Sequence, residues 1–306
     1  MRACPPFLLA LVAITVPPVT VAQQPSQSGE FVASDGVRIH YLVRGSGRPL
    51  VLLHGFALSA DLNWVGPGAL DSLATAFTVI VPDFRGHGRS DKPHDPAAYG
   101  ARFTEDVVEL LDHLKIRKAH VAGYSMGGAI ALKLLTTHPD RMRSAVLGGA
   151  GWQQPGSPPP PFIGDWLTNL DRAACEHTSV ATALQRPDVK ALPPPIVAAL
   201  DRNDPAALAA VLRGAGAFAV PEADIRAIEV PVHAVFGERD EGARAQVDAL
   251  ARVVPPLTVT ILPNADHAVA MAHPLLAAAI REFARAHQHG PKDREHPTSE
   301  RPHRGK

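Results

Sequence analysis

The stretch VAGYSMGGAIALKLL, residues 121–135, decides how the fold of this chain is interpreted. An apolar strand-like run ends just before Ser125, and an apolar helix-like run follows it. Gly123 and Gly127 flank the joint, and glycine has no side chain to obstruct a sharp turn. A serine at such a turn exposes its hydroxyl next to the N–H groups of a helix N-terminus. Taken alone, the motif is also consistent with a turn that carries no chemistry.

The other apolar segments predict alternating strands and helices around this joint. Short runs rich in Val, Ile and Leu predict buried strands at residues 49–54, 77–83, 118–124, 144–150, 232–237 and 257–262. Helical patterns lie between them at residues 103–115, 126–137, 242–253 and 269–287, and we expect Thr104 to cap the first. Residues 30–44 alternate and predict an antiparallel pair at a sheet edge. The expected fold is α/β, with a mainly parallel, doubly wound sheet of about eight strands.

Residues 152–229 interrupt this alternation. They contain PGSPPPPF and short Ala- and Leu-rich helical stretches, without a comparable apolar strand run. Functional sites of parallel sheets gather at the carboxyl ends of the strands, so a helical insertion there would act as a lid. We therefore expect a core in two parts, residues 30–151 and 230–287, separated by a helical cap or lid over residues 152–229.

The N-terminal segment has the features of a secretory signal peptide over residues 1–22. Arg2 supplies a positive charge, residues 7–16 are apolar, and Ala22 offers a small residue for cleavage. Two prolines then interrupt the apolar run too early for a membrane-spanning helix. The segment predicts a secreted or periplasmic protein with no stable membrane insertion after cleavage. An uncleaved apolar extension is the alternative.

The C-terminal segment and the cysteine content complete this picture. Residues 288–306 combine charges, proline and histidine with almost no apolar side chains, which predicts a disordered tail. If the first 22 residues are removed, Cys175 is the only cysteine left, so no intramolecular disulfide is expected.

The bulk composition narrows the classes of partner. The 306 residues include 30 Lys and Arg and 30 Asp and Glu, so no net field attracts nucleic acid, and no nucleic-acid partner is expected. The sequence contains neither a His-Glu-x-x-His run, nor paired Cys-x-x-Cys motifs, nor a phosphate-binding glycine loop followed by lysine. We expect no metal and no cofactor.

Three further motifs supply chemical partners for Ser125. The sequence HGF follows a predicted strand, so the N–H of Phe56 can join that of Met126 in binding an oxyanion. Asp240 follows another strand in FGERD, and His267 lies beyond the last strand in PNADHAVAMAHP. An imidazole can take the proton of a serine hydroxyl and return it to a leaving group, and a carboxylate can orient that imidazole. The chain order is serine, acid, histidine.

These motifs together resemble the α/β-hydrolase fold family over about residues 30–287. The similarity rests on HGF, DFRGHGRSDKP, GYSMGG, GERD and DHAVAMAHP, which follow the order of the family. The resemblance implies Ser125 as nucleophile, His267 as base and Asp240 as acid. It also implies an oxyanion hole made by the N–H groups of Phe56 and Met126.

Some assignments inside this site have alternatives. Glu238 and Glu241 flank the predicted acid, and either could replace it if the turn were offset by a residue or two. The cluster around Cys175 is a second candidate nucleophile, although no oxyanion hole accompanies it. His54 and His87 lie in motif loops, where we expect them to form structural hydrogen bonds.

Serine at the elbow also bears on the reaction. The HGF region resembles that of haloalkane dehalogenases and epoxide hydrolases. Those enzymes, however, use aspartate at the elbow position that Ser125 occupies here, whereas serine favours acyl transfer. The chain is closer to compact serine esterases and to cofactor-free haloperoxidase-like members of the family. We therefore predict cleavage of small or medium uncharged carboxylic esters through an acyl-enzyme.

Four other functions stay open at this point. Two use the same triad, in a haloperoxidase-like perhydrolase or a carbon–carbon bond hydrolase. The third is a non-catalytic ligand-binding member of the fold, and the fourth is an exported interaction module that works through its tail. Four aromatic residues are candidates for an apolar substrate pocket, or alternatively for core or lid packing: Trp64, Trp152, Phe162 and Trp166.

Overall fold

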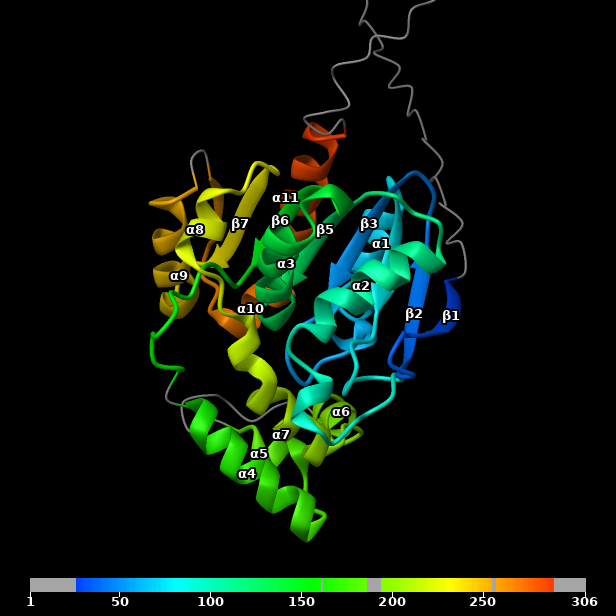
Figure 1. The fold of residues 1–306 in the computed structure, drawn as a ribbon, viewed down its shortest axis with the longest axis vertical. Helices are drawn as coiled ribbons and strands as arrows, with labels where there is room; N and C mark the ends of the chain where they lie inside the picture. Colours follow the sequence, from blue (N-terminus) through cyan, green and yellow to red (C-terminus); the bar gives the residue numbers. More distant parts are fainter. Residues whose placement is uncertain (1–25, 161, 186–193, 255–256, 289–306) are drawn as a thin grey trace, which may run out of the picture.

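The structure is a computed structural model that describes residues 26–160, 162–185, 194–254 and 257–288. A sheet crosses the molecule (Figure 1), and its eight strands follow the order β1-β2-β4-β3-β5-β6-β7-β8. β1 and β4 pair antiparallel with β2, and the other neighbouring strands pair parallel. The strands are β1 Gln27–Val32, β2 Arg38–Arg44, β3 Arg48–Leu53, β4 Phe77–Pro82, β5 Ala119–Tyr124, β6 Met142–Gly148, β7 Val232–Gly237 and β8 Thr258–Leu262. The predicted α/β fold with a mainly parallel sheet is confirmed.

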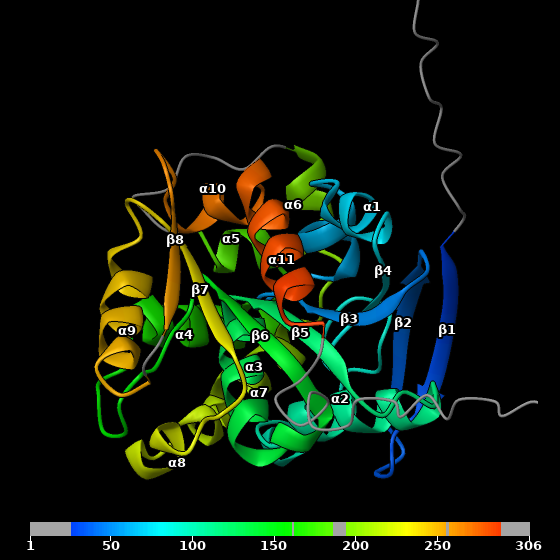
Figure 2. The same cartoon turned by 90° about the horizontal axis from the view of Figure 1, so that it is seen from above.

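Helices cover both faces of the sheet (Figure 2). One face packs against α1 (Ala69–Ala74) and α11 (Pro274–Ala286), and the other against α2 (Arg102–His113), α3 (Met126–Thr137) and α9 (Glu241–Ala251). Side chains of a strand point alternately to the two faces, so successive residues of β3 enter different apolar clusters. This double cover explains why β5 and β7 are buried along their whole length and read as continuous apolar runs.

Two helix predictions are wrong in detail. The helix expected over residues 269–287 is two helices, α10 (His267–Met271) and α11, because Pro274 has no N–H for a continuous helix and instead begins α11. Thr104 lies inside α2 and does not cap it, since its hydroxyl donates to the carbonyl of Ala101, the residue that precedes the helix. The short helical turn η1 (Asp61–Val65) and α1 were not expected from the sequence.

The interval between β6 and β7 is helical in the residues that the structure describes. It holds α4 Phe162–Glu176, α5 Val180–Ala183, α6 Pro194–Leu200, α7 Pro205–Gly214, η4 Ala215–Phe218 and α8 Glu222–Arg226. Helices α4 to α7 gather at one end of the sheet (Figure 1). They share a small apolar core with Ala57, which follows β3, so they lie over the carboxyl end of that strand. We call α4 to α7 the insertion; its role as a lid stays a prediction.

The two ends of the sequence fall outside these observations. The predicted signal peptide and the tail from residue 289 onward lie outside the described residues. Among the residues that are described, no helix has the length and apolar character needed to cross a bilayer. Cys175 is an exposed free thiol on α4.

Candidate active site

Ser125 occupies a strained position between β5 and α3. Its φ of 55° and ψ of −116° lie in a region that residues other than glycine rarely adopt. The surrounding backbone holds this conformation, because the N–H of Ser125 donates to the carbonyl of Gly148 at 2.7 Å and its own carbonyl accepts from Ala129 at 3.1 Å. The strain swings the side chain out of the strand, which is the purpose of a nucleophile elbow.

The glycines around the elbow are required by close packing of backbone. A Cβ atom at Gly123 would lie 2.0 Å from the carbonyl oxygen of Gly127. A Cβ atom at Gly127 would in turn lie 2.2 Å from the carbonyl oxygen of Leu53 in β3. Any side chain at these two positions would push α3 away from the sheet, so the Gly-x-Ser-x-Gly spacing follows from the geometry of the turn.

Ser125, His267 and Asp240 form one continuous hydrogen-bonded chain. His267 Nε2 lies 3.0 Å from Ser125 Oγ, and His267 Nδ1 lies 2.6 Å from Asp240 Oδ2. Asp240 follows β7 and is buried, and its other oxygen accepts the N–H of Ala243 at 3.1 Å, which caps α9. His267 is the first residue of α10, in the loop region beyond β8. The parallel strands therefore deliver all three side chains to one edge of the sheet.

Two residues that sequence reasoning did not identify position the imidazole. The hydroxyl of Tyr124 donates to the carbonyl oxygen of His267 at 2.5 Å, and its ring lies 5.5 Å from the imidazole, centroid to centroid. Gly149 has a φ of 56°, and a Cβ atom there would lie 3.1 Å from His267 Cε1. The elbow motif leaves the residue before serine unspecified, so the motif could not reveal the role of Tyr124.

The alternative acids and the alternative nucleophile occupy other places. Glu238 is exposed and accepts the N–H of Asn264 at 2.9 Å, and Glu241 is an exposed residue in the first turn of α9. Among the described residues, neither glutamate forms a hydrogen bond or an ion pair with His267, whereas Asp240 does. Cys175 lies on α4, outside the hydrogen-bonded chain.

The segments that carry the two predicted oxyanion donors lie next to Ser125. Met126 is the first residue of α3, and an N–H at that position has no acceptor within the helix. The HGF loop lies against the elbow, since a Cβ atom at Gly55 would be 3.5 Å from Ser125 Cβ. Asn63 Oδ1 accepts the N–H of Gly55 at 2.9 Å and so fixes the loop that presents Phe56. Both predicted oxyanion donors thus belong to segments that contact the serine.

The histidines of the motif loops form hydrogen bonds with backbone groups, His54 through both ring nitrogens and His87 through Nδ1. His54 Nδ1 lies 2.8 Å from the carbonyl oxygen of Gly55, and its Nε2 accepts the N–H of Phe84 at 2.9 Å. Complete burial lowers the pKa of His54, so the ring is neutral and links two loops. Burial likewise lowers the pKa of His87 to about 3, and its Nδ1 lies 3.0 Å from the carbonyl oxygen of Arg85.

The four predicted pocket aromatics divide into two pairs. Trp64 is fully buried in the core beside α1, and Trp152 is buried with its indole N–H donating to the carbonyl of Val220 at 2.9 Å. Trp64 and Trp152 are therefore packing residues, the alternative to a role in the substrate pocket. The ring of Trp166 instead stacks on that of Phe56, with centroids 5.8 Å apart and planes at 17°, and Phe162 packs against Trp166. Through Trp166, this pair on α4 contacts Phe56 of the HGF loop.

A second Ser–His–Asp chain lies elsewhere in the molecule. Ser28 Oγ is 2.8 Å from His40 Nε2, and His40 Nδ1 is 3.0 Å from Asp83 Oδ2. Asp83 also accepts the N–H groups of Ala60 and Arg89, and it ties β2 to the loops after β3 and β4. Ser28, however, lies inside β1, which continues to Val32, so no strained turn or helix N-terminus presents its hydroxyl.

This contrast predicts selective labelling by a fluorophosphonate probe. The probe should react with Ser125, because the elbow exposes its hydroxyl and two N–H groups can bind the phosphoryl oxygen. Ser28 should stay unlabelled despite its histidine and aspartate neighbours. Peptide mass spectrometry of labelled wild-type protein and of Ser125→Ala identifies the modified residue. Labelling at Ser28, or an unlabelled Ser125 in folded protein, would contradict this expectation.

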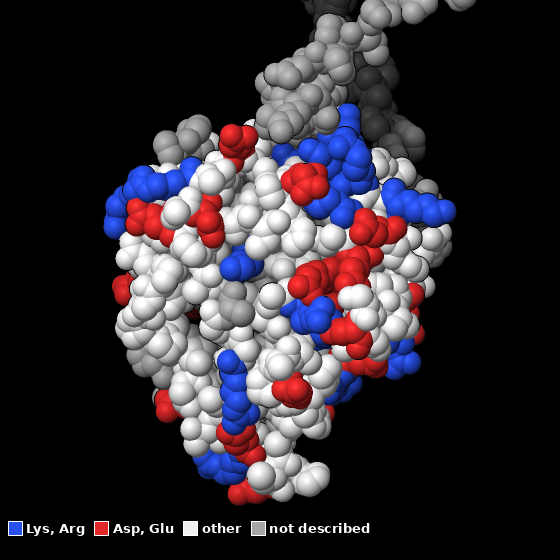
Figure 3. Space-filling model, viewed as in Figure 1, with Lys and Arg blue, Asp and Glu red and all other residues white. Residues whose placement is uncertain are grey.

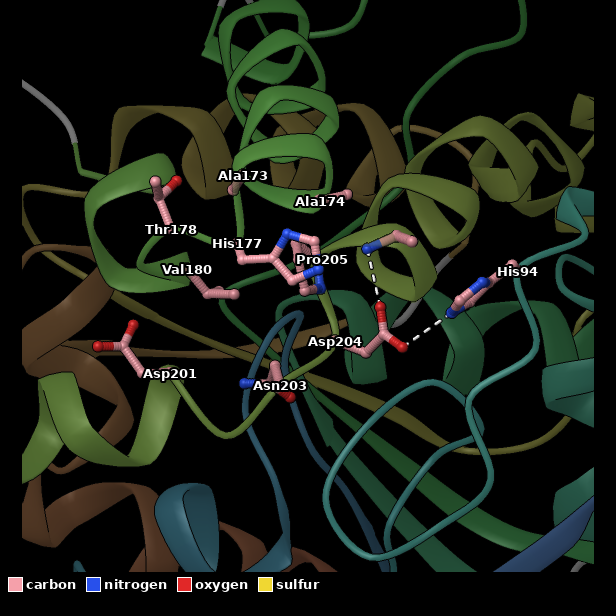
Figure 4. Close-up of a pocket in the computed structure, with 11 residues that line it drawn as sticks. His94, Ala173, Ala174, His177, Thr178, Val180, Asp201, Asn203, Asp204 and Pro205 are labelled. Atoms are coloured by element: carbon pink, nitrogen blue, oxygen red, sulfur yellow. Dashed lines mark hydrogen bonds and ion pairs between the residues drawn. The ribbon is translucent and has the colours of Figure 1, made fainter.

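The insertion contains a separate pocket of about 390 Å³ (Figure 4). His94 Nε2 and Asp204 Oδ2 are 2.8 Å apart in it, which joins the loop after β4 to the N-terminus of α7. None of the three residues of the hydrogen-bonded chain lines this pocket. Among the described side chains, no group of three or more His, Cys, Asp and Glu residues is placed to hold a metal ion.

Comparison with known sequences points to the α/β-hydrolase fold. The model of the alpha/beta hydrolase fold matches residues 48–173. The chain is 35% identical to the 2-hydroxymuconate semialdehyde hydrolase of Pseudomonas putida over 128 residues, which are 42% of this chain and 45% of that protein. It is 29% identical over 280 residues to a putative 2-succinyl-6-hydroxy-2,4-cyclohexadiene-1-carboxylate synthase of Bacillus subtilis, covering 83% of this chain and 97% of that one. The match to the first relative thus covers less than half of its length.

Comparison with solved structures agrees with this result. A thermophilic esterase from Thermogutta terrifontis superposes with a TM-score of 0.72 at 24% identity, covering 85% of this chain and 98% of that one. At this identity the likeness concerns the fold. The strand order, the strained serine between β5 and α3 and the matched sequences all agree, and the chain has the α/β-hydrolase fold.

Proposed function

We propose that this protein is a serine hydrolase that cleaves small or medium carboxylic esters through an acyl-enzyme. In this proposal Ser125 is the nucleophile, His267 the general base and Asp240 the acid that orients the imidazole. The N–H groups of Phe56 and Met126 form the oxyanion hole. The observation that carries the proposal is the unbroken hydrogen-bonded chain from Asp240 to a serine held at a strained elbow.

The chemistry follows from the positions of these groups. As Ser125 Oγ attacks the ester carbonyl, its proton passes to His267 Nε2, and the carbonyl oxygen becomes an anion that backbone N–H groups can bind. The buried carboxylate of Asp240 stabilises the imidazolium that forms. His267 then protonates the leaving alcohol. In the second half of the reaction His267 takes a proton from a water molecule, which attacks the carbonyl of the acyl-enzyme. The acid is released as the proton returns to Ser125 Oγ.

The surface supports an uncharged substrate of limited size. Lys and Arg side chains are interspersed with Asp and Glu on the face seen in Figure 3. Within the insertion, Arg213 pairs with Asp171 at 2.7 Å, so these charges neutralise each other. The placement of the insertion at the carboxyl end of β3 is consistent with a lid that limits substrate size. From the signal-peptide-like N-terminal segment, we also propose that the protein is exported to the periplasm or the medium.

A carbon–carbon bond hydrolase is the second candidate. The relative from Pseudomonas putida is a 2-hydroxymuconate semialdehyde hydrolase, and its similarity to this chain favours that alternative. The same triad can serve both reactions, and also perhydrolysis, because fold and triad do not select the substrate. Measuring kcat/KM for 2-hydroxymuconate semialdehyde and for a panel of esters separates the two functions. A higher value for the semialdehyde would favour the carbon–carbon bond hydrolase, and a higher value for an ester would favour the esterase.

Ester turnover is the first test of the proposal. Purified protein should hydrolyse p-nitrophenyl acetate and butyrate with kcat/KM in the usual range for enzymes, about 10⁴ M⁻¹s⁻¹ or above. Activity should fall on p-nitrophenyl palmitate, which the proposed lid would exclude. Removal of residues 290–306 should leave the rates unchanged, which also tests an interaction module that works through its tail. Folded protein that hydrolyses no ester of any chain length would contradict the proposal.

A further inference from the structure

We propose that Asn203, a residue of the insertion, is a positioning residue for the oxyanion hole. Its side-chain amide holds the HGF loop in the conformation that presents the N–H of Phe56. The inference rests on the proposed esterase function and deepens it. It gives the insertion a part in the rate of the reaction, in addition to its proposed part in limiting substrate size.

The HGF loop turns at a residue whose backbone is strained. The N–H of Leu58 donates to the carbonyl of Gly55 at 3.3 Å, which closes a four-residue turn with Phe56 and Ala57 at its centre. Ala57 has a φ of 58°, in the left-handed region that turns usually fill with glycine at this place. Such a conformation persists only where the surroundings hold it. The loop that carries the N–H of Phe56 therefore depends on contacts from outside the turn.

The side-chain amide of Asn203 supplies one of these contacts. Its Nδ2 donates to the carbonyl of Ala57 at 2.9 Å and to the carbonyl of Leu200, the last residue of α6, at 3.0 Å. An amide NH₂ group has two hydrogens, so it can serve both carbonyls at once. Asn203 thus fastens the strained residue of the loop to the end of a helix in the insertion.

Packing explains why the strained residue is alanine. Ala57 is buried in the small apolar core of the insertion, together with Leu170 of α4 and Leu208 of α7. A glycine would relieve the strain, but it would lose this buried methyl group. The loop and the insertion are therefore joined by an apolar contact as well as by the hydrogen bond from Asn203.

The other side of Phe56 is fixed by the core of the molecule. Asn63 Oδ1 accepts the N–H of Gly55 at 2.9 Å, and Gly55 lies against Ser125. Phe56 thus lies between two residues that are each held by an asparagine, one from the core and one from the insertion. Loss of the bond from Asn203 should displace the N–H of Phe56 and leave Ser125 in place. An oxyanion donor stabilises the transition state only when it is held at the correct distance.

Asn203→Leu tests this role, since leucine has a shape close to that of asparagine and no donor. The variant should lower kcat for p-nitrophenyl butyrate about 10- to 100-fold, less than the loss of a whole oxyanion donor. KM should stay within about twofold of the wild-type value, because formation and hydrolysis of the acyl-enzyme both pass through an oxyanion and slow together. Folded Asn203→Leu protein with a wild-type kcat would overturn the proposal.

Asn203→Ser keeps the test available if the leucine variant does not fold. Its hydroxyl ends one bond short of the amide nitrogen and has one hydrogen in place of two. It should lower kcat in the same direction, and an unchanged kcat would count against the proposal in the same way.

The rate of fluorophosphonate labelling separates positioning from stability. The probe reacts at Ser125 with the help of the same oxyanion contacts, so the second-order rate constant of labelling should fall by a factor similar to that in kcat. A purely structural role would lower the fraction of protein that becomes labelled and leave the rate constant unchanged, which would overturn the proposal. Labelling needs no ester. A wild type that is labelled but hydrolyses no ester would contradict the esterase function, while the labelling rates would still test Asn203.

His94→Ala is the matched control. His94 Nε2 lies 2.8 Å from Asp204 Oδ2, so this pair forms a second connection between the core and the insertion, one residue beyond Asn203 (Figure 4). The pair does not include a residue of the HGF loop. The variant should keep kcat and the labelling rate near the wild-type values. Equal losses in His94→Ala and Asn203→Leu would show that any loosening of the insertion slows the reaction, and would overturn the specific role of Asn203.

Discussion

Replacing Ser125 by alanine is expected to lower kcat for p-nitrophenyl butyrate by about four to six orders of magnitude, as the loss of a triad nucleophile does. The hydroxyl is the attacking atom in the proposed mechanism, and His267 cannot substitute for it from its place on α10. Folding should be unaffected, because the recorded partner of Ser125 Oγ is His267 Nε2 and the backbone bonds of the elbow stay in place. Stopped-flow or discontinuous assays of purified protein measure the loss.

Ser28→Ala is the matched control for this variant. It removes a serine hydroxyl that also lies within 2.8 Å of a histidine nitrogen, but at a position inside a regular strand. Its kcat should stay near the wild-type value. Thermal unfolding of both variants checks the fold. If Ser125→Ala retained wild-type rates, or if Ser28→Ala lost them, the assignment of the nucleophile would be wrong.

Asp240→Asn is expected to lower kcat by about 10⁴-fold, the loss seen when a triad carboxylate becomes an amide. The carboxylate accepts the Nδ1–H of His267 at 2.6 Å, which leaves Nε2 free to accept the serine proton. An amide can instead donate to Nδ1 and fix the opposite tautomer. Asparagine is also a good helix cap, so the bond to Ala243 and the start of α9 should survive. The catalytic loss is measured as kcat, and the unfolding temperature shows whether the fold is retained.

Glu238→Gln is the control for the acid. Its carboxylate accepts the N–H of Asn264 on the surface, and glutamine can still accept that bond. The variant should retain kcat near the wild-type value. The opposite pattern, with an active Asp240→Asn and an inactive Glu238→Gln, would exchange the roles of the two residues.

The features that could be predicted most directly from the sequence are those set by local steric constraints. The apolar runs that form β3 to β7 are visible because strands covered on both faces carry mostly apolar side chains. The prediction of a buried strand over residues 257–262 is wrong, because β8 lies at the edge of the sheet and exposes Val259 and Ile261. Gly123 and Gly127 are visible for a similar reason, since their Cβ atoms would collide with backbone 2.0 Å and 2.2 Å away. Helix ends are less visible: the pattern over residues 269–287 reads as one helix, but Pro274 ends the continuity and begins α11, which His273 caps.

Contacts between distant residues were decided by the tertiary structure. Ser125 and His267 are 142 positions apart, and their bond exists because parallel strands end at one edge of the sheet. The sequence contains the residues of a second Ser–His–Asp chain as well, and only the packing places Ser28 in a strand and Ser125 on an elbow. The anchoring role of Tyr124 is equally nonlocal.

The sequence by itself determined the alternation of strands and helices, the serine elbow and the order of the candidate site residues. These features depend on contacts between close neighbours along the chain, which a short stretch of residues specifies. The tertiary structure decided which carboxylate meets His267, which tryptophans are core residues and which one stacks on Phe56. Those outcomes depend on how whole elements pack, because a side chain on one helix meets its partner only after the sheet and the insertion are assembled.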